Sequence, residues 1–172
     1  MSFEDLVGQY RRKEEEERLK EADQALARSS APGELHRMLQ DVVSALKAQR
    51  AVPMRVKEAK GLLGRTFVGY PLRATRMKGD TYRVQLISED ARLWDGTWSP
   101  DGPGRFSEYK YDEPLLSGQA ASVFGMTLRA ASDGHVYDAW QQSEVEVPHV
   151  RSDPRNQLAR LVADYKGPLG RP

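Results

Sequence analysis

The chain has 172 residues, of which 39% are hydrophobic and 30% are charged, and its formal net charge is +1. This length and composition suit one domain, or a small domain with a helical extension, built around a core of moderate size. The sequence has no cysteine, which excludes disulfides, thiolate metal sites and thiol nucleophiles. Its first residues place acids before bases, and no window is long and apolar enough for a membrane helix. We therefore expect a soluble, cytoplasmic protein without a membrane partner.

The first predicted element is a helix from Ser2 to about Ala27, with Ser2 and Asp5 as a capping box. An apolar stripe occupies positions i, i+3, i+4 and i+7 of its first turns. This stripe consists of Phe3, Leu6, Val7 and Tyr10. The following run, residues 11–18, has no apolar residue. Such a helix either bridges two contacts as a solvated element or docks its first two turns on a partner. The stripe is therefore our candidate partner-binding surface.

A second helix is predicted from about residue 34 to residue 50, after the break at residues 29–33. Its apolar side contains Leu35, Leu39, Val42 and Leu46, and this side is wide enough to pack against a core. Because the connection is short, the two helices are predicted to form an αα-hairpin, an extension covering residues 1–50.

The period of the hydrophobic pattern changes to two from Arg65 onward, whereas residues 54–64 are ambiguous. Strands are predicted at 65–75, 82–87, 92–98, 105–111, 122–131, 135–140 and 143–147. Pro71 predicts a sheet edge or a bulge in the first of these strands. The last element is a helix capped by Asp153, with Pro154 at its first position and an apolar stripe of Leu158, Leu161, Val162 and Tyr165.

These elements predict an α+β fold. An N-terminal helical hairpin is followed, over residues 54–168, by a twisted antiparallel sheet of about five or six strands. We expect this sheet to be a meander or a half-open barrel, with the C-terminal amphipathic helix plugging its open side.

Catalytic motifs are missing from the sequence. His36, His135 and His149 have no neighbour at metal-ligand spacing, and no phosphate-binding loop or serine-nucleophile motif occurs. We expect neither a metal nor a cofactor. One enzymatic alternative is a hydrolase with an aromatic-acidic pocket. That pocket would contain Trp94, Asp95, Trp98 and Asp101.

Charge is strongly segregated along the chain. Residues 47–83 contain ten bases and two acids, whereas residues 84–150 contain four bases and eleven acids. A basic segment of this density is typical of a surface for a polyanion. The candidate polyanion-binding residues are Arg55, Lys57, Lys60, Arg65, Arg73, Arg76, Lys78 and Arg83. Alternatively, the basic and acidic strands pair with each other across the sheet.

The sequence therefore predicts a small non-enzymatic binding module. It would engage a protein partner, or assemble with itself, through the charged N-terminal helix and the basic segment 47–83. The main alternative is a protein that binds DNA or RNA through the basic segment, without sequence preference.

Overall fold

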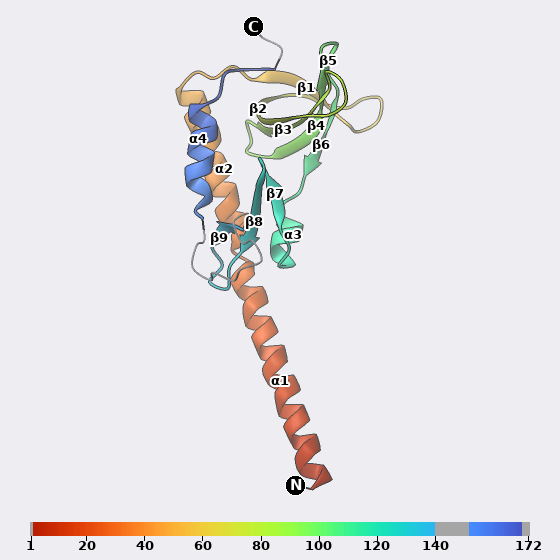
Figure 1. Ribbon diagram of the computed structural model, residues 1–172, viewed down its shortest axis with the longest axis vertical. Coiled ribbons are helices and arrows are strands. Elements are labelled where there is room, and N and C mark those ends of the chain that lie inside the picture. The colour runs from red at the N-terminus through yellow and green to blue at the C-terminus, as the bar shows by residue number, and fades with distance from the viewer. Residues whose placement is uncertain (1, 140–151, 170–172) are drawn as a thin grey trace.

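The computed structural model describes residues 2–139 and 152–169 of the chain. A long helical stem leads into a body that contains a β-barrel, a small three-stranded sheet and a C-terminal helix (Figure 1). The predicted α+β class is confirmed. Residues 140–151 lie outside the described part of the chain, and with them the strand expected at 143–147.

The stem consists of α1 (Phe3–Arg28) and α2 (Ala31–Ala48), which follow each other end to end as one bent helix (Figure 1). The predicted capping box is present, with the Ser2 backbone N–H donating to Asp5 Oδ2 at 2.8 Å. The predicted helical hairpin is wrong. Ser29 and Ser30 both keep right-handed helical angles, and Pro32 lies in the first turn of α2, where a missing N–H is tolerated. The break therefore bends the chain without reversing it.

The barrel is made of five strands that follow each other as a meander. They are β1 (Met54–Glu58), β2 (Thr66–Arg76), β3 (Tyr82–Ser88), β4 (Leu93–Ser99) and β6 (Arg105–Tyr109). Consecutive strands pair antiparallel, and β1 pairs with β6 to close the ring. The first and fifth strands of a meander run in the same direction, so this closing pair is parallel. The sheet is therefore mixed rather than purely antiparallel, and the ambiguous segment after residue 54 supplies its first strand.

The inner face of the barrel is a small apolar core. Its buried members are Met54, Val56, Val84, Leu86, Trp94 and Phe106. Gly96 lies directly under the Phe106 ring, where an added Cβ atom would come within 2.5 Å of a ring carbon. The short strand β5 (Gly102–Pro103) only extends the edge of β4.

The second sheet contains β7 (Ala121–Val123), β8 (Met126–Ala130) and β9 (Val136–Asp138), and α3 (Asp112–Leu116) precedes it. The strand predicted at 122–131 is therefore a hairpin. Its turn lies at Phe124 and Gly125, which have φ angles of 47° and 84°. Hairpin turns of type I′ need such positive angles at both central residues, but a bulky residue seldom adopts them. The turn was therefore not predicted, because Phe124 fits the period-two pattern of a continuous strand.

A larger core lies between α2, the second sheet and part of the barrel's outer face. Leu35, Leu39 and Leu46 of α2 have no exposed surface, so α2 packs with the β elements, whereas α1 has no buried residue. Helix α4 (Pro154–Ala163) packs along α2 through Leu158 and Val162 (Figure 1). It does not plug the barrel as expected, because its apolar stripe is covered by α2. Among the described residues, no helix has the length and hydropathy needed to cross a membrane.

Candidate functional site

The predicted partner-binding stripe lies at the far end of the stem, away from the body (Figure 1). Phe3 is 80% exposed, Tyr10 is 73% exposed and Leu6 is 40% exposed, while Val7 is partly covered. An apolar cluster on a surface with no contact to the body is a candidate interaction site. The structure thus brings these four residues together on one exposed helix end.

The apolar residues near the other end of α1 point in a different direction. Leu19 and Leu26 are 63% and 74% exposed. At about 100° per residue, an α-helix turns these two side chains roughly 140–160° away from Phe3. The body lies beside this other end of α1, because Gly134 in the turn between β8 and β9 approaches the carbonyl oxygen of Ala27. The two apolar patches of α1 therefore do not form one continuous seam.

The candidate polyanion-binding residues fall into separate groups. Arg55 and Lys57 share the outer face of β1, and Lys57 is paired with Arg105 of β6. With Thr66 and Gly104, these three cations line an open cavity of about 550 Å³. No carboxylate of the described residues lies within 4.0 Å of any of the three cations.

Three of the other bases are paired with acids nearby. Glu58 Oε1 lies 3.6 Å from Lys60 Nζ, and Glu58 Oε2 lies 3.9 Å from Arg65 Nε. Arg76 Nη2 lies 3.7 Å from Asp80 Oδ1, and Lys78 is exposed in the turn between them. These pairs partly neutralise three of the candidate cations, while Arg55 and Lys57 line one cavity and Arg73 and Arg83 line another that shares no residue with it.

The last two bases, Arg73 and Arg83, line a polar groove on the outer face of the barrel. The strand register places Arg73 opposite Gln85, Gln85 opposite Asp95, and Asp95 opposite Ser107. A bulge between Pro71 and Arg73 shifts the register of β2, as Pro71 predicted. Without it, Arg73 would pair with Val84 and point into the barrel. The cavity of this groove has a volume of about 410 Å³.

The β7–β8 hairpin forms the opposite wall of this polar groove. Gln85 Nε2 donates to the carbonyl oxygen of Ser122 at 3.1 Å, and Gln85 Oε1 accepts from the backbone N–H of Phe124. The backbone N–H of Ser122 donates to the Tyr109 hydroxyl at 2.9 Å. Arg73 Nη1 reaches the carbonyl oxygen of Phe124 at 3.5 Å. Hydrogen bonds from polar side chains of the barrel thus hold the hairpin against the outer face of the barrel.

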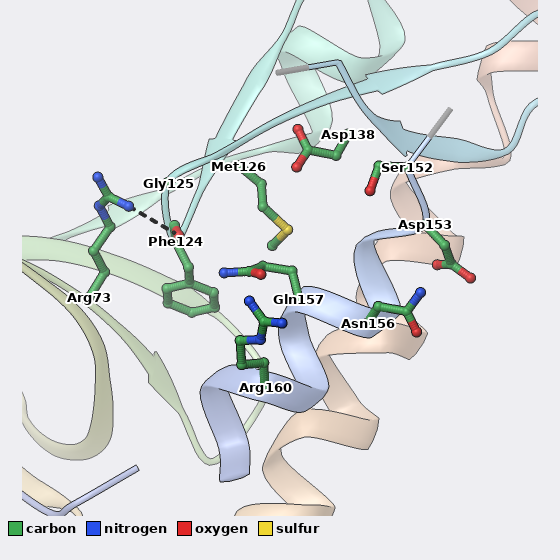
Figure 2. A pocket seen from close by; sticks show the side chains of 10 residues that line it. All are labelled: Arg73, Phe124, Gly125, Met126, Asp138, Ser152, Asp153, Asn156, Gln157 and Arg160. Carbon is green, nitrogen blue, oxygen red and sulfur yellow. Dashed lines mark hydrogen bonds between the residues drawn. The ribbon is translucent and has the colours of Figure 1, made fainter. Parts of the chain in front are cut away.

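A second cavity of about 450 Å³ continues from Arg73 and Gly125 toward α4. Figure 2 shows Arg73 approaching from the barrel side, while Gln157 and Arg160 project from α4 on the other side of Phe124. Asp138 and Ser152 lie beyond Met126 in the same view. The two cavities therefore place cationic and hydrogen-bonding groups along one path between the barrel, the hairpin and α4.

Burial raises the pKa of Asp95, which lines the polar groove, and of Tyr111, which follows β6 and contacts His36 of α2. Desolvation raises the pKa of the Asp95 carboxyl, and this effect is opposed in part by the charge of Arg83 and by the Gln85 side chain. Burial, aided by the negative charges of Asp112 and Glu108, raises the pKa of Tyr111 to about 12. The groove therefore destabilises the charged form of the Asp95 carboxyl relative to water.

The aromatic-acidic pocket expected for a hydrolase is not formed. Trp94 is 1% exposed inside the barrel, where its Nε1–H donates to Ser88 Oγ at 3.1 Å. Asp95 lies on the outer face, because successive strand residues point to opposite sides. The Trp98 ring packs near Tyr82 at a centroid distance of 6.0 Å, and Asp101 is exposed in the turn before β5.

The histidines have structural contacts where they are described. His36 Nδ1 lies 3.2 Å from the Tyr111 hydroxyl, and His135 Nδ1 lies 3.4 Å from Glu34. His149 lies outside the described residues. Within residues 2–139 and 152–169, no group of three or more potential ligand side chains could hold a metal ion.

Sequence reasoning missed Gln85, Tyr109, Ser122 and Gly125 as members of the polar groove. The period-two pattern placed Gln85 on a strand face with Arg83, but the contact with residue 122 depends on the position of a distant hairpin. No family model, no curated protein and no solved structure matches this chain.

Proposed function

We propose that this protein is a small non-enzymatic binding module that docks on a protein partner through the exposed end of α1. The supporting observation is that α1 projects from the body without a buried residue and carries Phe3, Leu6, Val7 and Tyr10 at its far end. Helical stability in proteins comes mostly from packing of an apolar face, and α1 has no such packing of its own. A stripe at i, i+3, i+4 and i+7 is the pattern with which a helix enters an apolar groove on another protein.

The partner that fits this stripe is a different protein. A seam between two copies of α1 would need apolar residues on one continuous side of the helix, but Leu19 and Leu26 face away from Phe3. C-terminal to the stripe, three bases at residues 11–13 are followed by four acids at residues 14–17. The complementary surface is an apolar groove flanked first by acidic and then by basic residues.

The combined substitution of Phe3 and Tyr10 by alanine tests this proposal. We expect the free energy of unfolding to stay within about 0.5 kcal/mol of that of the unchanged protein, because both side chains are exposed. Partner binding should weaken by at least about 2 kcal/mol if these aromatics are the anchors of the interface. Quantitative co-purification from the native cell measures the partner retained.

The matched control is the combined substitution of Leu19 and Leu26 by alanine. These residues are similarly exposed and lie on the same helix, and this variant should retain the partner. Equal retention by both variants would rule out the stripe as the docking surface. Self-association that is lost only in the Phe3 and Tyr10 variant would identify a second copy as the partner instead.

One observation favours a second candidate function, the binding of nucleic acid without sequence preference. Arg55, Lys57 and Arg105 line one open cavity on adjoining strands with no carboxylate in ion-pair distance among the described residues. We expect the log–log salt slope of DNA or RNA binding to flatten by about two units when Arg55 and Lys57 are both replaced by alanine. Filter binding at several salt concentrations measures it, and no retention even at low salt would eliminate this candidate.

A further inference from the structure

Arg73 and Arg83 differ from the paired arginines of the barrel. Among the described residues, Arg65, Arg76 and Arg92 each lie within 4.0 Å of a carboxylate, at 3.9, 3.7 and 3.3 Å. Neither Arg73 nor Arg83 has such a partner in this part of the chain, although both line the same cavity. They occupy diagonal positions of β2 and β3 on the same outer face, where long side chains are within reach of each other. Two like charges that line one groove repel each other, and an anion bound between them reduces that repulsion.

The remaining walls of the groove supply hydrogen-bonding groups. The Tyr109 hydroxyl accepts the backbone N–H of Ser122, so its own proton is available to a ligand. Thr75 and Thr127, which carry hydroxyl groups, also line the cavity, whose volume of about 410 Å³ is in the range typical of small-molecule sites. Guanidinium groups bind carboxylate and phosphate oxygens with matched geometry.

The hairpin tip contacts Arg73, and both Arg73 and Gly125 line this groove and also the second cavity. A Cβ atom added at Gly125 would collide with Arg73 Nη1, so a larger residue here would displace the guanidinium from its position along the hairpin tip. The φ angle of 84° at Gly125 also favours glycine. Because Gln85 fixes the hairpin from the barrel side, the groove is formed before any ligand arrives.

We propose that this groove binds a small molecule through an oxyanion group, a carboxylate or a phosphate, held between Arg73 and Arg83. Asp95 lies on the same face, opposite Gln85, and gives the groove an acceptor. The ligand class is therefore a small molecule with an oxyanion at one end and a hydroxyl or ammonium donor at the other. This site lies on the barrel and not on α1, so it goes beyond the docking function and is tested separately.

Thermal unfolding and calorimetry with two series of probes test the proposal. Glycerol 3-phosphate and inorganic phosphate represent the phosphate source, and malate and acetate represent the carboxylate source, each compared with chloride at equal ionic strength. We expect saturable binding and a raised Tm in one series, because a ligand of the folded state stabilises it by mass action. The series that binds identifies the oxyanion.

Substitutions assign the binding to the groove. Arg73→Gln and Arg83→Gln should each weaken binding by about tenfold or more, the loss of a charge-assisted hydrogen bond. Arg76→Gln, on the same strand but paired with Asp80, should leave the affinity unchanged. Asp95→Ala, which removes the acceptor oxygens, should remove the preference for hydroxylated over plain anions. The unliganded Tm of each variant checks folding. No saturable binding in either series, or binding that survives both Arg73→Gln and Arg83→Gln, would overturn the proposal.

Discussion

Replacement of Trp94 by alanine is expected to lower the free energy of unfolding by about 3–5 kcal/mol, the usual cost of deleting a buried aromatic side chain. Trp94 is 1% exposed in the barrel core, and its ring centroid lies 4.4 Å from that of Phe67. Its removal leaves a cavity and also leaves Ser88 without the Nε1–H donor. Equilibrium unfolding in urea measures the loss.

Trp98→Ala is the matched control for the barrel core. Trp98 lies on the same strand and the same face, but it is only partly buried, beside Tyr82 near the strand end. We expect a clearly smaller loss for this variant. Equal losses for the two variants would mean that the barrel interior is not closed around Trp94.

Replacement of Leu39 by alanine should cost about 2–5 kcal/mol, because Leu39 has no exposed surface in the larger core. Leu19→Ala on the same stem removes a side chain that is 63% exposed, and its cost should be below about 0.5 kcal/mol. Thermal or denaturant unfolding of both variants compares them directly. A loss below about 0.5 kcal/mol for Leu39→Ala would place α2 outside the core and favour a division of the chain near residue 50.

The starts of helices were predicted correctly where a capping residue precedes a hydrophobic pattern of helical period. Ser2 with Asp5, and Asp153 with Pro154, mark the starts of α1 and α4 in the sequence and in the structure. The relation between elements was harder to predict. The short break at Ser29 and Ser30 is compatible with a reversal or with a bend, and only the backbone angles of those residues decide between them. The parallel pairing of Lys57 with Arg105 joins residues that are distant in sequence and leaves no local pattern.

The candidate sites were predicted only in part. The apolar stripe of α1 was predicted because all its residues lie within two helical turns. The charge count identified Arg73 and Arg83, but it could not separate them from Arg76. That separation depends on the bulge after Pro71 and on the hairpin turn at Phe124, which together define the polar groove. Long-range register and an unusual turn residue are not readable from one sequence.

Photo-crosslinking from position 3 tests most directly the central claim that the end of α1 is a docking surface. A benzoylphenylalanine in place of Phe3 should form one discrete adduct with a different protein in the native cell, and the same group in place of Leu19 should not. The adduct should disappear when Tyr10→Ala is added, while the thermal unfolding of the protein stays unchanged because Tyr10 is 73% exposed. No discrete adduct from position 3, or the same adduct from both positions, would contradict the claim.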